Sequence, residues 1–124
     1  PLDRIDDCKV QEATKFIPYE GDIDDNFKDI IGVSLRFHEP CQHIVFKAYP
    51  AIAPYIETKP IHHSQRIVER HEDYTIFSLD LIPNYEFETI MMSYADNCEI
   101  LEPQDLKESL VCRAKNIIKF NVGQ

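Results

Sequence analysis

The chain has 124 residues, of which 44% are hydrophobic and 28% charged, and its 22 acidic and 13 basic side chains give a formal net charge of −9. This length suits one domain with a core of its own, and the 10% aromatic content excludes a disordered acidic tail. The charge argues against strong binding to nucleic-acid phosphates, because such binding depends on clustered lysines and arginines.

The first predicted elements are a strand and a short helix, joined by a linker. Residues 4–10 alternate weakly between apolar and acidic side chains, which predicts a strand and is interpreted as the last strand of a preceding domain. Residues 12–25 have the composition of a loop or linker. A short helix is predicted over residues 25–31 and is stopped by Gly32.

Two strand pairs are expected in the middle of the chain. Residues 33–37 and 43–49 have strand character and are separated by a turn-rich stretch, which predicts an antiparallel pair. Prolines limit residues 51–56 to a short helix. Residues 65–71 and 74–82 then predict a hairpin with one buried side. The side chains expected on that side are Phe77, Leu79 and Leu81.

The last third of the chain predicts a helix, a strand and a second helix. Asn84 is a favourable N-cap, and the apolar side chains after it recur at the spacing of an amphipathic helix. Residues 98–101 predict a brief strand, and another amphipathic helix is expected from Pro103 to near Phe120. The order of elements predicts an α+β fold, in which an antiparallel sheet has helices packed on one face.

The sequence contains no recognisable catalytic motif. Its three glycines fit neither a phosphate-binding loop nor a nucleophile elbow. The nearest arrangement of a serine and a base is His62-His63-Ser64. We therefore predict no catalytic residue, no enzyme activity and no cofactor, and we keep a small hydrolase as a less favoured alternative.

The four cysteines and five histidines do not predict a metal site. Cys41 and His43 would have to combine with His62 and His63, yet these spacings differ from those of zinc sites. The cysteines are expected to be reduced thiols of a cytoplasmic protein, since a domain of this size does not need disulfides. The apolar runs are only a few residues long, so no membrane-spanning segment is predicted.

Three residues in and before the predicted hairpin are candidates for ligand binding. His62 is expected either to bridge backbone groups and fix the turn after the proline-rich region, or to contact a ligand. Arg66 and Arg70 each lie two residues from Val68, which predicts that they share one face of the strand. That row is interpreted either as a solvated sheet edge or as a docking strip for an anion or an acidic partner.

Several segments together resemble the C-terminal extension of WYL-domain bacterial transcriptional regulators. They are KPIHHSQ at residues 59–65, the hairpin after it, the helix that starts with YEFE at residues 85–88, and CEILEPQDLKESL at residues 98–110. The opening LDRI at residues 2–5 is similar to the closing strand of the WYL domain itself. The resemblance implies that residues 1–17 are the end of a WYL domain with a linker and that residues 18–124 are the extension.

The resemblance also implies the architecture of the whole regulator. WYL-domain regulators carry an N-terminal winged helix-turn-helix, a small Sm-like WYL β-barrel that senses an effector, and an extension of ferredoxin-like character that helps the protein to dimerise. Effectors in the family include single-stranded nucleic acid. Of the family's ligand-binding elements only Arg4 is matched here, and DNA would be bound only through a winged-helix region outside this chain.

We therefore expect a non-catalytic regulatory and dimerisation domain, which forms a homodimer and responds to an effector such as nucleic acid or a nucleotide. Residues 67–81 and 106–117 are the surfaces expected to meet the second copy. The alternative is a module that senses a small anion or a nucleotide through His62, Arg66 and Arg70.

Overall fold

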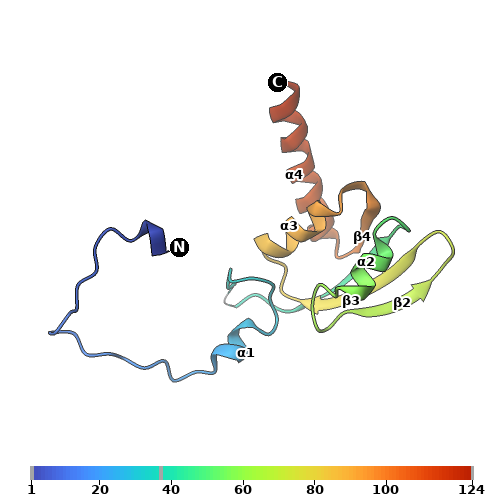
Figure 1. The fold of residues 1–124 in the computed structure, drawn as a ribbon. Coiled ribbons are helices and arrows are strands. Elements are labelled where there is room, and N and C mark those ends of the chain that lie inside the picture. The colour runs from blue at the N-terminus through green and yellow to red at the C-terminus, as the bar shows by residue number, and fades with distance from the viewer. Residues whose placement is uncertain (1, 37, 124) are drawn as a thin grey trace.

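The computed structural model describes residues 2–36 and 38–123. Its centre is a four-stranded antiparallel sheet with the spatial order β2-β3-β1-β4 (Figure 1). The strands are β1 (Gln42–Ala48), β2 (Arg66–Arg70), β3 (Thr75–Leu81) and β4 (Cys98–Glu102). Helix α2 (Ala53–Thr58) connects β1 to β2, and α3 (Tyr85–Ser93) leads from β3 toward β4. This β-α-β-β-α-β order confirms the predicted α+β fold and its ferredoxin-like character.

One face of the sheet forms the hydrophobic core with α2 and α3. Side chains on β1 alternate, so that Ile44, Phe46 and Ala48 are buried while the residues between them are partly exposed. Phe46 lies opposite Phe77 of β3, and the two rings stack with centroids 5.4 Å apart. The helices contribute Ile56, Phe87 and Met91 to the same cluster. Each large side chain buried there stabilises the fold by about 1.5–3 kcal/mol.

The β2-β3 hairpin confirms the second predicted strand pair. Phe77, Leu79 and Leu81 are fully buried, as expected. β2 is an edge strand, and all five of its residues are exposed. Its register against β3 shifts between Ile67 and Glu69, which marks a bulge. The alternation of side chains therefore changes phase in the middle of β2.

Asn84 joins α3 to the chain that precedes the sheet. Its side-chain oxygen accepts from the Phe87 N–H at 2.9 Å, as predicted for an N-cap. Its amide group donates to the carbonyl oxygens of Ile31 at 2.8 Å and Ser34 at 3.2 Å. The side chain is fully buried, so these bonds fix residues 31–34 against the start of α3.

Helix α4 (Gln104–Val122) begins beside β4 and projects away from the sheet (Figure 1). Of its residues, only Leu106 is buried. The apolar side chains of Ile117, Ile118 and Phe120 are 52%, 62% and 76% exposed. The outer half of α4 therefore presents apolar surface that the described part of the chain does not cover. No helix within residues 2–36 and 38–123 is long and apolar enough to cross a membrane.

The N-terminal segment differs from its prediction. A short 3-10 helix occupies Leu2–Arg4, and residues 5–10 have no regular structure, so the strand predicted for residues 4–10 is wrong. Residues 2–22 are exposed and run apart from the sheet (Figure 1). Among the strands that the structure describes, none lies beside residues 4–10 to supply the hydrogen bonds that hold a strand in place.

The strand pair predicted before the hairpin is also wrong. Residues 33–36 form no strand, and Phe37 lies outside the described residues. β1 instead pairs with β3 on one side and β4 on the other, which leaves it no free edge for a third partner. The short helix before this region is α1 (Ile23–Phe27), which begins two residues earlier than predicted because Asp22 caps it through the Asp24 N–H.

Candidate functional site

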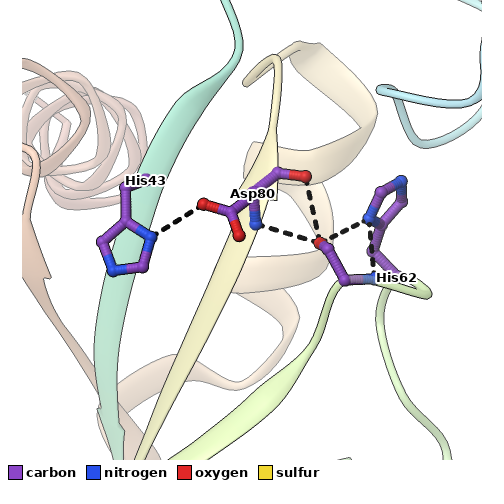
Figure 2. Close-up of polar contacts among 4 residues, drawn as sticks. His43, His62 and Asp80 are labelled. Atoms are coloured by element: carbon purple, nitrogen blue, oxygen red, sulfur yellow. Dashed lines mark hydrogen bonds and ion pairs between the residues drawn. The ribbon is translucent and has the colours of Figure 1, made fainter.

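A network of polar side chains joins the loop before β2 to the end of β3 and to β1 (Figure 2). We refer to its residues as the His62 cluster: His43, His62, His63, Ser64 and Asp80. The His62 residue is only 8% exposed, whereas the side chains of His43 and Asp80 are each 58% exposed. The cluster thus runs from the protein interior to the open face of the sheet.

His62 binds the main chain of a segment that is distant in sequence. Its Nε2 donates to the carbonyl oxygen of Lys28 at 2.7 Å, and Nε2 of His63 donates to the same oxygen at 3.0 Å. Because a carbonyl oxygen can only accept, both Nε2 atoms carry a proton. Nδ1 of His62 also accepts from the Ser64 N–H at 3.3 Å, so His62 bridges two backbone groups, as expected.

Ser64 ties the same loop to β3. Its Oγ accepts from the Asp80 N–H at 2.9 Å and donates toward the Asp80 carbonyl oxygen at 3.0 Å. The same Oγ lies 2.7 Å from Nδ1 of His62, so its single proton has two acceptors in reach. The hydroxyl group is therefore held by main-chain groups of the sheet as well as by the histidine.

The carboxylate of Asp80 contacts a different histidine. Asp80 and His43 face each other in the register of β3 and β1, and Oδ1 of Asp80 lies 2.7 Å from Nδ1 of His43. In a serine hydrolase the acid orients the histidine that activates the serine. Here the acid contacts His43 while Ser64 contacts His62, so the two pairs do not form one triad (Figure 2). The cluster connects main-chain segments to one another.

The chain before the sheet is held at further points near the cluster. The carbonyl of Asp29 accepts from the main chain just after β3 at 2.6 Å, and Oγ of Ser34 donates to Oε1 of Glu86 at 2.6 Å. The bond from Ser34, with nearby amides, lowers the pKa of Glu86. Gly32 has a φ of +72°, and a Cβ at this position would lie 2.7 Å from Cγ of Glu86. These contacts and the histidine bonds define the clasped segment, residues 28–34.

Arg66 and Arg70, predicted to share one face of the strand, lie on opposite faces of the sheet. Arg70 lies opposite Thr75 on the core face, and it forms a bidentate pair with Glu57 of α2 at 2.6 and 3.0 Å. Arg66 lies opposite Ser78 on the other face, and it donates to main-chain carbonyls of its own loop at 2.8 and 3.2 Å. The expectation that both share one face is wrong because the bulge in β2 changes the alternation between them.

Arg4 belongs to the exposed turn Leu2–Arg4, in the N-terminal segment that runs apart from the sheet (Figure 1). Of the four residues predicted to bind a ligand, only His62 lies in the polar network described above. Ligand binding by Arg4, His62, Arg66 and Arg70 stays a prediction.

Two of the four cysteines, Cys41 and Cys98, lie in surroundings that favour the protonated thiol. Within residues 2–36 and 38–123, no group of three or more His, Cys, Asp or Glu side chains is placed to hold a metal ion. All four cysteines are free thiols. Burial raises the pKa of Cys98 to about 12, and burial also raises the pKa of Cys41, where nearby aspartates add to the effect. Both groups therefore favour the thiol form, which is the less reactive one.

An apolar hollow of about 340 Å³ lies where α3, β4 and α4 meet. Its lining includes Met91, Met92, Cys98, Ile100, Leu110 and Val111. We use the name α4 surface for this hollow together with the exposed Ile117, Ile118 and Phe120. It overlaps the partner surface predicted at residues 106–117. The sequence does not predict the hollow itself, because its other walls come from α3 and β4, and no local pattern shows that these elements meet α4.

The fold can be compared with known families. Residues 40–118 match the family model of the WCX domain, and this range contains all four strands with α2 and α3. No curated protein was found to match the chain. Because the matched range is more than half of the chain, the chain belongs to the family of WCX domains, which are C-terminal domains associated with WYL domains.

Proposed function

We propose that the chain is the regulatory and dimerisation part of a WYL-type transcriptional regulator, at the C-terminal end of that protein. It has no catalytic role, works in the cytoplasm and takes part in the response to an effector. DNA is bound through a winged-helix region outside this chain. The observation that carries the proposal is the exposed apolar surface of α4 on a domain of the WCX family.

The α4 surface supports dimerisation with a second copy of the chain. Ile117 and Ile118 are more than half exposed, and they continue the apolar hollow along the helix. Contiguous apolar surface of this kind marks sites of protein interaction. The first turn of α4 carries Asp105 and its last turn carries Lys119. Two antiparallel copies of the helix therefore bring opposite charges together at both ends.

A chain of contacts supports the transmission of an effector signal to the α4 surface. The clasped segment bonds to Asn84 at the start of α3. Further along α3, Glu88 accepts from Oγ of Ser109 at 2.8 Å and pairs with Arg113 of α4 at 3.4 Å. A movement of the clasped segment can therefore be transmitted through contiguous contacts along α3 to α4.

The dimerisation part is tested by measuring the mass of the chain in solution by light scattering at tens of micromolar. We expect a dimer for the unmodified chain and a monomer for Ile118→Glu. The matched control is Asn116→Glu, which introduces the same charge at an exposed position on the polar side of the helix and should remain dimeric. A monomeric unmodified chain, or a dimeric Ile118→Glu variant, contradicts the proposal.

The regulator part is tested at the level of the gene. The proposal requires that the coding region immediately upstream of this chain encodes a winged helix-turn-helix and a WYL barrel. An upstream region with a different domain would show that the WCX domain serves another kind of protein.

A further inference from the structure

Another hollow lies between α2 and α3, and it shares no lining residue with the His62 cluster. Its volume is about 480 Å³, within the range of about 300–1,000 Å³ that is usual for small-molecule sites. The lining residues that matter for its chemistry are Ile52, Tyr55, Lys59, Ile61, Ile90 and Tyr94. None of the described lining residues is acidic, although the chain carries a net charge of −9.

The walls of this hollow are apolar and already fixed in place. Ile52, Ile61 and Ile90 are partly buried and pack against the hydrophobic core. Close packing on the core side restricts their rotamers, so the surface they offer to the hollow exists before any ligand binds. An apolar group of matching size can cover this surface without a rearrangement of the domain.

Tyr94 adds a hydrogen-bond donor to the apolar walls. The residue is 8% exposed, and its hydroxyl makes no hydrogen bond within the described part of the chain. The hydroxyl oxygen is itself accessible to solvent, since the fully buried side-chain atom without a partner in the described part of the chain is Oε2 of Glu86. Burial raises the pKa of Tyr94, with Cys98 and Tyr55 adding to the effect, so the group keeps its proton and can donate.

Lys59 supplies a positive charge at the same hollow. Its Nζ lies 5.6 Å from the centre of the Tyr55 ring, and it has no carboxylate within 4.0 Å among residues 2–36 and 38–123. Lys28 and Lys107 pair with carboxylates, whereas Lys59 shares its unpaired state within the described residues with Lys115 and Lys119 of α4 and differs from them by lying beside an apolar hollow. An unpaired ammonium group beside apolar walls favours a ligand that carries one negative charge.

We propose that this hollow binds a small amphiphilic carboxylate, which has an apolar or aromatic body and a single carboxylate group. The body covers the three isoleucines, Lys59 provides the countercharge, and the Tyr94 hydroxyl donates a hydrogen bond. A phosphate or nucleotide fits this site less well, because a single lysine and one hydroxyl do not match its charge and its many acceptor oxygens. The site is independent of dimerisation through the α4 surface.

The test is a titration of the full chain, labelled at isoleucine methyl groups, with 1-naphthaleneacetate followed by NMR. We expect saturable shifts at Ile52, Ile61 and Ile90 at millimolar ligand, and no shift at Ile100 in the hollow beside α4. The neutral analogue 1-naphthaleneacetamide has nearly the same shape and should bind several times more weakly.

Two variants connect the binding to its proposed cause. Lys59→Gln should weaken binding of 1-naphthaleneacetate by about fivefold, the upper range for an exposed ion pair, and leave the amide unchanged. Lys107→Gln, at the rim of the other hollow, is the matched control and should change neither ligand. The proposal is overturned if the three isoleucines do not shift, if acid and amide bind equally, or if Lys59→Gln binds the acid like the unmodified chain.

Discussion

Replacement of Asn84 by alanine tests how the clasped segment and α3 are held together. Asn84 is fully buried and takes part in three hydrogen bonds, one from the Phe87 N–H and two to the carbonyl oxygens of Ile31 and Ser34. Loss of an N-cap costs about 1 kcal/mol, and each carbonyl that loses its donor adds about 1 kcal/mol. We therefore expect the free energy of unfolding to fall by about 3 kcal/mol.

Urea unfolding followed by circular dichroism at one protein concentration measures this difference. The matched control is Asn121→Ala, because the Asn121 amide also donates to a carbonyl, that of Ile117 at 2.8 Å, but at an exposed position. Its effect should stay within about 0.5 kcal/mol. Asn84→Ser keeps a capping oxygen without the two donors and should lose about 2 kcal/mol. The reasoning is refuted if Asn84→Ala and Asn121→Ala are equally stable.

Three further predictions concern backbone, thiol and charge. Gly32→Ala should lower the free energy of unfolding by about 1–2 kcal/mol in the same urea assay, because the φ angle of residue 32 is +72° and the new Cβ would lie 2.7 Å from Cγ of Glu86. An unchanged midpoint of urea unfolding would contradict this prediction. Iodoacetamide near neutral pH should alkylate the exposed Cys112 long before Cys98, whose pKa burial raises to about 12, and peptide mass spectrometry would reveal equal labelling if this is wrong. The hydrogen bond from Arg70 lowers the pKa of Glu57 below its usual value of 4.5. The unmodified chain should therefore be more stable than Glu57→Gln above pH 4.5, and this difference should disappear as the pH falls through the lowered pKa. Thermal melts from neutral to acidic pH measure this advantage, and a difference that does not change with pH would argue against the pair.

Periodic patterns in the sequence predict the elements whose burial is decided locally. In β3 the buried residues Phe77, Leu79 and Leu81 alternate with more polar ones, and α3 follows directly on the capping Asn84. Helix α4 is predicted by the same reasoning, because its apolar residues share one side. For these elements, neighbouring residues along the chain carry all the information that the prediction needs.

The remaining features depend on partners that are distant in sequence. Residues 33–37 have the composition of a strand, but both edges of β1 are already occupied by strands that follow much later. The bulge in β2 has no marker in the sequence, and it places Arg70 on the same side of the sheet as Glu57. The sequence draws attention to His62, yet its acceptor is the carbonyl of Lys28, and a main-chain atom leaves no pattern among side chains.

The position of β1 in the sheet affects how the domain forms during protein synthesis. β1 is made first of the four strands but lies in the interior, between β3 and β4. Until the ribosome has released β4, one edge of β1 is bare and can pair with a neighbouring nascent chain. The domain is therefore protected from aggregation only when nearly its whole length has been synthesised. A chain that stops before β4 keeps an unpaired edge on β1 and is prone to aggregate.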